Sequence, residues 1–430
     1  MRVIGMLLLL ACEQADGDKD VDTPGDEATP TETAPTTDLT WHADIRPIAE
    51  RSCVGCHGGE GVGGFSLDGY DAFVEWSQAS RAAVSERTMP PWRADGDCNS
   101  YQNDFSLSDE EVASVVGWID GGMPEGSADT YPGDVTPWQP VSLDRVDLTL
   151  SMPEVYTPDD APDDYRCFLL EWPYDDDVWV TGYEFQPGNL DVVHHIIPFI
   201  IAPDDAAAYR ALDAAEDGAG YTCFGGPGGD VFALARLGWL GSWAPGSSAS
   251  LAPEGTGVRV KPGSLVAMQV HYYTAAGKAP DQSSVDLRVE TEPQGWMEIQ
   301  PWTDITWVAG LGMEIPPNTT GVQHRFTYTA EAGDRFQINT AGLHMHTHGR
   351  AARLSVVRAS GEEDCVLDVP NYDFNWQRDY ALSEPVTVMP GDTVTLECTW
   401  DNPTDETISW GDGTGDEMCL GITALSGISE

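Results

Sequence analysis

The last two thirds of the sequence consist of short runs in which apolar and polar residues alternate. Examples are VSLDRVDLTLSM, VWVTGYEFQP and EPVTVMPGDTVTLECTW, and clusters of Gly, Pro, Asn and Asp separate the runs. An alternation of period two gives a strand one apolar and one polar face, and frequent turn residues join such strands in antiparallel order. Because roughly 290 residues are too many for one core of this kind, we expect two all-β antiparallel sandwich (jelly-roll) domains, over residues 146–293 and 294–430.

A helical pattern precedes the β-rich part. In the stretch SLSDEEVASVVGWIDGG, Ser108 is placed to cap a helix, Glu111 lies three residues later, and glycines follow the apolar positions. This order of cap, apolar face and glycine is typical of a complete short helix. We predict a small all-α domain over residues 40–127, followed by a linker rich in Pro, Gly and Asp over 128–145.

The sequence CVGCH in the helical part is the attachment pattern of a c-type haem. Cys53 and Cys56 would bind the vinyl groups, and His57 would bind the iron. A zinc site would need two further ligands nearby, and a redox dithiol would need a βαβ context. Met89, in ERTMPPW, is the predicted second iron ligand; Met123 is a weaker choice, and open or other axial ligation is the alternative. Residues 40–127 are therefore predicted to form a cytochrome c-like, electron-transferring haem domain.

The first residues indicate export. The chain begins with MRVIGMLLLLAC, in which one basic residue and a short apolar run lead to Cys12. The run is too short to span a bilayer but suits an export signal. LLAC resembles the lipobox of a bacterial lipoprotein, which implies a signal peptide over residues 1–12 and a lipid on the sulfur of Cys12; an ordinary cysteine in an ordinary start is the alternative. Residues 13–39 are acidic and nearly free of large apolar side chains, so we expect a disordered tether.

These features predict an exported protein, lipid-anchored to the cell envelope of a bacterium and facing the periplasm or the cell surface. Such a compartment is oxidising, so disulfides are expected among the remaining cysteines. The formal charge of −50, with only three lysines, argues against a nucleic-acid partner, because phosphate binding needs a positive face.

Seven of the nine histidines fall in the β-rich part. His344, His346 and His348 occupy alternate positions in GLHMHTHGR, so a strand would direct all three rings to one face. His194 and His195 are adjacent in VVHHIIPF, and such a pair can share one ion only at a bulge, at a strand end or through different ring nitrogens.

His271, in MQVHYY, adds one more imidazole on an apolar run. Sets made only of imidazoles suit copper or zinc, whereas the thioether of Met418, in GDGTGDEMC, is a poor zinc ligand and a good one for Cu(I). The combination therefore favours copper. For any single histidine, a hydrogen-bonded core position is the alternative.

In order along the chain, the segments RCFLLEWP, VVHHIIPF, VAMQVHYY, HMHTHGR, PVTVMPGDTVTLECTW and GDEMC resemble the copper type II, ascorbate-dependent monooxygenases. The resemblance spans about Val146 to Leu425. It implies a copper site that relays electrons at His194, His195 and His271. It implies a second copper site, where oxygen binds and hydroxylation occurs, at His344, His346 and Met418. His348 stands where the family pattern usually has no ligand.

The resemblance also implies two disulfides, Cys167 with Cys223 and Cys398 with Cys419. Cys98 and Cys365 have no implied partner and could bond each other across domains. The peptide-amidating members of the family have an arginine at the position of Gly342 and an Asn-Leu-Tyr run at the position of Leu420 to Ile422, so peptide amidation is not expected here.

The sequence thus predicts a copper-dependent monooxygenase that hydroxylates a C–H bond of a small organic substrate with O2. Its cofactors would be two copper ions and one covalently bound haem c, with electrons from ascorbate or a periplasmic donor supplied through the haem domain. One alternative is a non-catalytic haem and copper electron-transfer or copper-binding lipoprotein. Another is a binding module whose histidines hold metal structurally.

Overall fold

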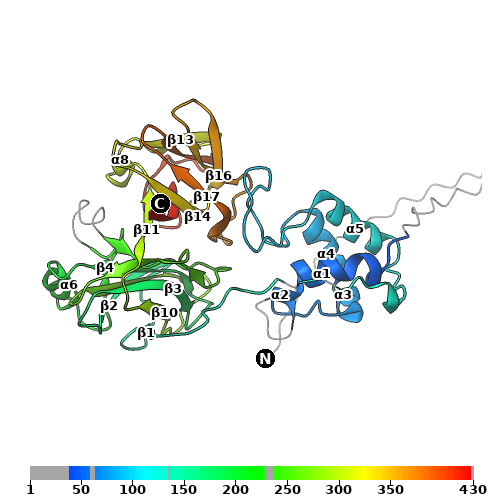
Figure 1. The fold of residues 1–430 in the computed structure, drawn as a ribbon, viewed down its shortest axis with the longest axis horizontal. Coiled ribbons are helices and arrows are strands. Elements are labelled where there is room, and N and C mark those ends of the chain that lie inside the picture. The colour runs from blue at the N-terminus through cyan, green and yellow to red at the C-terminus, as the bar shows by residue number, and fades with distance from the viewer. Residues whose placement is uncertain (1–37, 59–62, 134, 137, 229–236, 428–430) are drawn as a thin grey trace, which may run out of the picture.

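The computed structural model describes residues 38–58, 63–133, 135–136, 138–228 and 237–427. Figure 1 shows helices α1 to α5 on one side of the molecule and two β regions on the other, one above the other. The signal peptide, Cys12 and nearly all of the predicted tether lie outside the described residues. Among the described helices, none is long and apolar enough to cross a membrane.

The helical part consists of short elements around a small aromatic core. Trp41, Phe73 and Trp118 are buried there, with the rings of Phe73 and Trp118 5.3 and 5.8 Å from that of Trp41. The longest helix begins at the expected capping box of Ser108 and Glu111. The elements are η1 (Trp41–Ile45), α1 (Arg46–Ser52), α2 (Val54–His57), α3 (Tyr70–Glu75), α4 (Ser77–Ser85), α5 (Asp109–Asp120) and η2 (Ala128–Thr130).

The first β region is built from two facing sheets. One is the five-stranded sheet β5-β2-β9-β4-β6, and the other face is formed by β1, β10, β3 and β8. Their apolar faces enclose the largest core of the molecule. The elements are β1 (Leu148–Ser151), β2 (Asp163–Glu171), β3 (Val178–Gln186), β4 (Val193–Ile201), α6 (Ala206–Asp213), β5 (Tyr221–Thr222), β6 (Gly238–Trp239), β7 (Ser250–Leu251), β8 (Thr256–Val260), β9 (Leu265–Tyr273) and β10 (Ser284–Glu290).

The second β region packs the sheet β13-β18-β15-β16 against β11, β20, β14 and β17 around a core of its own. A small sheet pairs β12 with β19. The elements are β11 (Gly295–Trp302), α8 (Ile305–Val308), β12 (Glu314–Ile315), β13 (Thr319–Thr329), β14 (Phe336–His344), β15 (Gly349–Val357), β16 (Glu363–Val369), β17 (Tyr380–Val388), β18 (Thr393–Asn402), β19 (Ile408–Ser409) and β20 (Leu420–Gly427).

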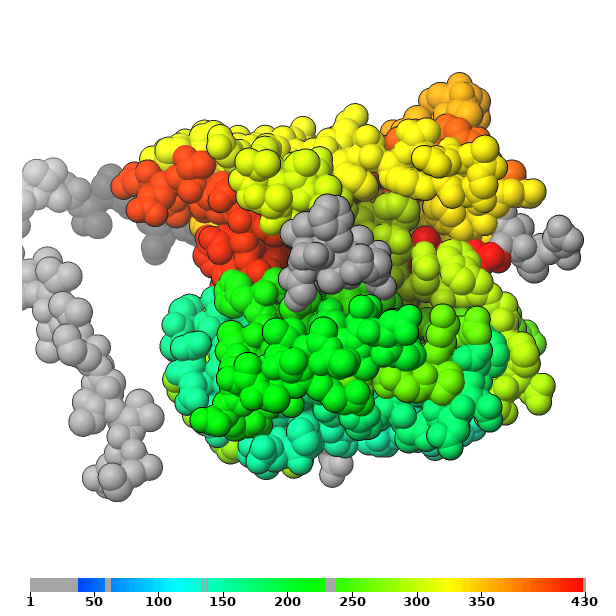
Figure 2. All heavy atoms as spheres, turned by 90° about the vertical axis from the view of Figure 1, so that its left-hand side faces the viewer, coloured from blue at the N-terminus to red at the C-terminus, as the bar shows by residue number. Residues whose placement is uncertain are grey.

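One nine-stranded sheet joins the two β regions. Its order is β1-β10-β3-β8-β11-β20-β14-β17, with β7 beside β3. The joining strand is β11, which pairs in parallel with β8 through Gly295 and Trp296 and in antiparallel order with β20. Figure 2 shows the two β regions in contact along a long boundary.

The predicted fold class, an all-α cytochrome c-like domain followed by two all-β sandwiches, is wrong. The described residues are mostly strands, the helices are few and short, and the β regions share a sheet. Part of the segment assigned to an all-α domain belongs to the second β region: Ala94 and Tyr101 lie in its core, Tyr101 bridges to Leu382, and Cys98 is bonded to Cys365. These residues have the spacing of a helix face, but they form no helix and are held against β16 and β17 instead.

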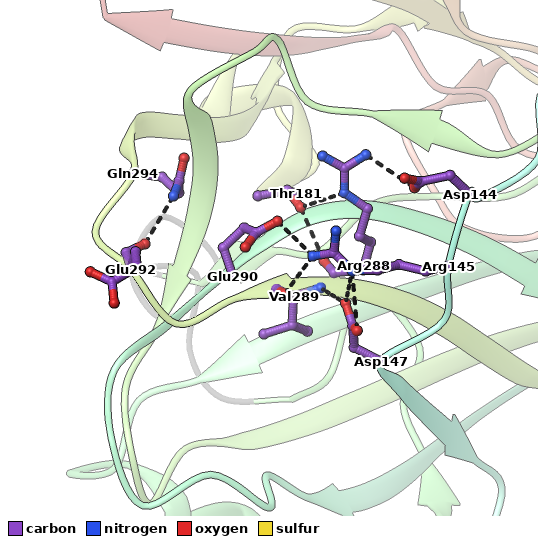
Figure 3. Close-up of polar contacts among 9 residues, drawn as sticks. All are labelled: Asp144, Arg145, Asp147, Thr181, Arg288, Val289, Glu290, Glu292 and Gln294. Atoms are coloured by element: carbon purple, nitrogen blue, oxygen red, sulfur yellow. Dashed lines mark hydrogen bonds and ion pairs between the residues drawn. The ribbon is translucent and has the colours of Figure 1, made fainter.

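Polar contacts fix the end of the predicted linker on the edge of β10 (Figure 3). Arg145 donates to Glu290 at 2.5 Å and to Asp147, and Asp144 pairs with Arg288 at 3.2 Å. The linker is thus anchored directly before β1.

Candidate metal centre

The first histidine set lies on two neighbouring strands, β4 and β9. The strand register pairs His195 with His271 and shifts between Val193 and His195, so His194 sits in a bulge. The bulge turns the adjacent rings of His194 and His195 toward one point, which a regular strand would not allow. Nδ1 of His195 lies 3.3 Å from Nδ1 of His194 and 3.4 Å from Nδ1 of His271. Three ring nitrogens therefore converge as the ligands of one ion would.

The chemistry of this set fits a metal. Burial lowers the pKa of His194 to about 2 and lowers that of His195 well below its ordinary value, so both rings are neutral, as metal ligation requires. Nε2 of His194 is buried and has no hydrogen-bond partner among the described residues. This nitrogen is the one far from the cluster, so the fit to a metal rests on the neutral rings and the converging Nδ1 atoms.

A carboxylate behind His271 fixes the orientation of its ring. Asp163, on β2, lies 2.9 Å from Nε2 of His271, which directs Nδ1 to the cluster. Burial would raise the pKa of Asp163, but hydrogen bonds from His271 and Thr414 outweigh it and lower the pKa to about 2. A carboxylate that holds the far nitrogen of a ligating histidine is the usual support of a metal site.

The second histidine set lies where β14 ends. Nδ1 of His344 is 2.5 Å from Oε1 of Gln377, and Nδ1 of His346 is 3.1 Å from the carbonyl oxygen of Asp416. The ring centroids of the two histidines are 5.2 Å apart. Because both Nδ1 atoms have protein partners, both Nε2 atoms are left for a metal. Desolvation lowers the pKa of His344 to about 4 and that of His346 to about 3, so these rings are also neutral.

The buried carboxylate of Glu417 joins this histidine turn to the loop before β20. It accepts the backbone N–H of His346 at 2.9 Å, the backbone N–H of His348 at 2.6 Å and Nε1 of Trp400 at 2.8 Å. Burial raises the pKa of Glu417 to about 7, although these hydrogen bonds oppose the rise. Met418 follows Glu417 directly, and the disulfide of Cys419 with Cys398 ties the loop to β18.

His348 takes a different direction from the other two histidines of its run. Its half-buried side chain lines a surface pocket that also includes Tyr372, Arg350 and Asp401. Its backbone, held by Glu417, is the part that contributes to the turn.

The two histidine sets adjoin each other at the junction of the β regions. The ring centroids of His195 and His344 are 6.0 Å apart, and Phe374 stacks on His194 at 4.6 Å and lies 6.1 Å from His346. We call His194, His195, His271, His344 and His346 the five-histidine cluster.

Residues of β2 clamp the two sides of this cluster together. Both carboxylate oxygens of Asp163 accept hydrogen bonds from Thr414, one from its N–H at 3.0 Å and one from its hydroxyl at 2.5 Å. Tyr165 stacks on His271 at 4.0 Å and donates its hydroxyl to the carbonyl of Asp412 at 2.7 Å. The loop before β20 is therefore bonded to the two residues of β2 that support His271.

Disulfides pair Cys167 with Cys223 and Cys398 with Cys419, as expected, and a third pairs Cys98 with Cys365. Three disulfides fit a protein that folds in an oxidising compartment.

The residues of the haem motif lie apart from this cluster, in and before α2. Cys53 and Cys56 are free thiols, and burial raises the pKa of Cys53 to about 12. The pKa of His57 is lowered by desolvation, and its Nδ1 lies 3.4 Å from the carbonyl of Phe65, which leaves Nε2 for an iron ion. Thiols and imidazole thus fit covalent haem attachment. Met89 is 41% exposed, and the described residues show no contact between it and His57.

Residues 305–422 match the family model for the copper type II ascorbate-dependent monooxygenase, C-terminal domain. This match includes His344, His346 and Met418. This part of the chain is thus similar to the C-terminal domain of the copper type II monooxygenases. The chain is 26% identical over 300 residues to DBH-like monooxygenase protein 1 of Gallus gallus, covering 65% of this chain and 47% of the relative. It is 26% identical over 351 residues to dopamine beta-hydroxylase of Rattus norvegicus, covering 74% and 54%.

The chain spans about half the length of these curated monooxygenase relatives. The names of these relatives, together with the description of the matching family model, agree with the enzyme class predicted from the sequence, a copper monooxygenase. The family match lies wholly within the second β region. The haem motif and the lipobox are therefore outside the matched residues.

Sequence reasoning missed four supporting residues of the cluster: Asp163, Phe374, Gln377 and Glu417. Only Glu417 could have been found from the sequence, because it directly precedes the predicted ligand Met418 in the segment GDEMC. The others come from segments without any metal-binding pattern.

Proposed function

We propose that this protein is a copper-dependent monooxygenase that hydroxylates a C–H bond of a small organic substrate with O2. The observation that carries the proposal is the five-histidine cluster, in which three Nδ1 atoms converge on one side and two histidines with occupied Nδ1 atoms face them. The related monooxygenases support the same class of reaction.

Each set of ligands would hold one copper ion. His194, His195 and His271 would bind the first through Nδ1, and His344, His346 and Met418 would bind the second. Copper, when bound, supplies the one-electron chemistry by which O2 is activated. The thioether of Met418 favours the reduced ion, which is the form that must meet O2.

The protein residues around the metals orient ligands and exclude water. Asp163 and Gln377 hold one imidazole of each set by its far nitrogen. Phe374 stacks on His194 and lies beside His346, which helps to shield these two rings from solvent. Such preorganisation means that the ligands need little rearrangement when a metal changes oxidation state.

The substrate is not a peptide carboxylate in this proposal. A side chain at position 342 would meet Oδ1 of Asp379 at 2.3 Å, so the place of the peptide-binding arginine is filled. Asp379 is partly buried, and desolvation raises the pKa of its carboxyl to about 6. A side chain at position 342 would require Asp379 to move, and an ionised Asp379 would repel a carboxylate substrate.

Each turnover needs two electrons, for which we propose ascorbate or a periplasmic donor. A haem bound at Cys53, Cys56 and His57 is proposed as the point of entry, with the protein held at the cell envelope by a lipid on Cys12. The free thiols and the neutral His57 support the haem. Haem absorbance after alkaline pyridine treatment of the purified protein, compared with the Cys53→Ser and Cys56→Ser double variant, tests it directly.

The central experiment loads the protein with copper, reduces it and follows oxygen uptake with a panel of aliphatic, aromatic and amine compounds under ¹⁸O2. We expect labelled product with at least one compound, and its loss in His346→Ala. His324→Ala is the control, because His324 contacts the carbonyl of Glu314 outside the cluster. Oxygen uptake without labelled product, equal in both variants, would favour the alternative of a copper-holding protein without hydroxylase activity.

A further inference from the structure

The loop between β16 and β17 contacts both histidine sets, although it supplies no predicted metal ligand. The ring of Phe374 stacks on His194 at 4.6 Å and lies 6.1 Å from His346. Oε1 of Gln377 lies 2.5 Å from Nδ1 of His344. A residue that fixes the far nitrogen of a ligating imidazole also fixes where its other nitrogen points. The position of this loop therefore helps to set the geometry of both histidine sets.

Hydrogen bonds within the loop join residues 373–377 into one turn, which we call the Asp373 turn. The carbonyl of Asp373 accepts the N–H of Trp376 at 3.0 Å, and Oδ1 of Asp373 accepts the N–H of Asn375 at 3.0 Å. Nε2 of Gln377 donates to the carbonyl of Phe374 at 2.8 Å. A displacement of Asp373 would therefore be passed to both of the side chains that contact the histidines.

Arg93 binds the Asp373 turn from a segment outside the β regions, between α4 and α5. Its Nη2 donates to Oδ2 of Asp373 at 2.7 Å, and its Nη1 donates to the carbonyl of Arg87 at 3.3 Å. Its backbone N–H donates to the hydroxyl of Tyr380 at 3.2 Å. The side chains of Arg93 and Asp373 are 14% and 33% exposed, so solvent and salt screen this ion pair less than they screen a pair on the open surface.

The backbone that follows Arg93 is fixed on β16, the strand before the Asp373 turn. The N–H of Asp95 donates to the carbonyl of Asp368 at 2.8 Å, and Cys98 is bonded to Cys365. An ion pair between two mobile side chains adds little, because ordering both of them costs entropy. Arg93 instead reaches Asp373 from a fixed point, so the ion pair can hold the turn in one place.

We propose that Arg93 is a positioning residue of the two copper sites, which it reaches through Asp373 and the Asp373 turn. The turn, held in this way, keeps Phe374 and Gln377 against the histidines. The proposal rests on the proposed function for the role of the metals, whereas the hydrogen bonds of Arg93 need no metal. It implies that the residues that shape the copper sites extend beyond 305–422, the match to the monooxygenase C-terminal domain, to the segment before α5.

The test uses the full chain and compares Arg93→Gln with Arg81→Gln. Arg81 is the matched control, because it also pairs with an aspartate, Asp120, at 2.7 Å, but within the helical part. In the metal-free protein, amide hydrogen exchange of residues 371–379 is followed by mass spectrometry. We expect exchange about tenfold faster in Arg93→Gln and unchanged in Arg81→Gln, because only the first loses a charge-assisted hydrogen bond to the turn.

A copper measurement separates positioning from general stability. In the copper-loaded, oxidised protein, we expect Arg93→Gln to change the Cu(II) EPR spectrum and to weaken copper binding at the second set about tenfold, since Gln377 supports His344. Arg93→Lys keeps a positive charge to pair with Asp373, and it should restore the spectrum in part. Asp373→Asn should act like Arg93→Gln, and the double variant should be no worse than either single variant.

Unchanged exchange and an unchanged EPR spectrum in folded Arg93→Gln overturn the proposal, and so do additive effects of Arg93→Gln and Asp373→Asn. Faster exchange with an unchanged spectrum also overturns it, because Arg93 would then stabilise the turn without affecting the metals. If Arg93→Gln does not fold, Asp373→Asn carries the test, since it keeps the backbone contacts of Arg93. A wild-type chain that binds no copper contradicts the proposed function instead, and the exchange comparison still shows whether Arg93 holds the turn.

Discussion

The two histidine sets are held by different kinds of scaffold. His194, His195 and His271 lie on paired strands of one sheet, so the strand register and one bulge bring them together. His344 and His346 lie where a strand ends, and the chain that completes their site is the loop before β20. The first set is therefore positioned by many backbone hydrogen bonds. The second depends on a few contacts, chiefly those of Glu417 and the Cys398–Cys419 disulfide.

The substitution Glu417→Ala should have the largest effect, and it should affect the second histidine set without affecting the first. It leaves three buried N–H donors without an acceptor, which should lower the free energy of unfolding by about 3 to 5 kcal/mol and abolish copper binding at the second set. Urea unfolding and copper titration measure both effects. Glu397→Ala, which removes a partly exposed partner of Arg325, should cost less than about 1 kcal/mol. A Glu417→Ala protein with two tightly bound coppers would refute this dependence.

The next prediction compares two disulfides, one in each β region. Replacing Cys398 and Cys419 by serine, or Cys167 and Cys223 by serine, should each cost about 3 to 4 kcal/mol of stability, given separations of 21 and 56 residues. Only the first change should weaken copper binding at the second set, because only that disulfide braces the loop of Met418. Equal copper affinities in the two double variants would contradict the role assigned to the loop.

The support of the first set is tested by Asp163→Asn. Loss of the charge behind His271 should weaken copper binding at the first set about 10- to 100-fold. Asp164→Asn is a matched control, because the carboxylate of Asp164 is bonded to Tyr156 and Asp159 and not to a histidine. Competition with a copper chelator measures the affinities, and an equal loss in both variants would mean that the change acts through the fold of β2.

Both sets share a pH dependence in the metal-free protein. The pKa values of these histidines are lower in the folded state than in the unfolded state, so the unfolded chain takes up more protons below about pH 6.5. Stability is therefore present above that pH and is lost as the pH falls, by about 1.4 kcal/mol for each such histidine at pH 5.5. Urea midpoints at pH 7.5 and 5.5 should differ less in His195→Ala than in the wild type.

The sequence predicted features that depend on local spacing. The alternating strands and the capped helix at Ser108 follow from residues within one segment, and the structure contains both. For His194 and His195 the sequence left a bulge, a strand end or different ring nitrogens open, and the structure has the bulge. The choice of His344 with His346, in preference to His346 with His348, came from the family resemblance. That His344 and His346 bind the copper together stays a prediction. The hydrogen-bond partners of their Nδ1 atoms favour it, because they leave both Nε2 atoms free for the metal.

Features made by distant segments were not predicted. The nine-stranded sheet forms because β11 pairs with β8 and β20, and neither pairing has a signature in the sequence. Residues 94–101 were assigned to a helical domain because one strong helix and the CVGCH motif flank them, yet they are buried on the second β region. Asp163 and Gln377 were not predicted either, because each supports a histidine that lies more than 30 residues away in the sequence.

The most direct test of the account is the number and kind of metal ions per chain after anaerobic copper loading and dialysis. The five-histidine cluster with Met418 predicts two copper ions per chain, falling to one in His346→Ala and also to one in His271→Ala. A single copper shared by both sets, or a preference for zinc over copper, would contradict the assignment of two separate copper sites.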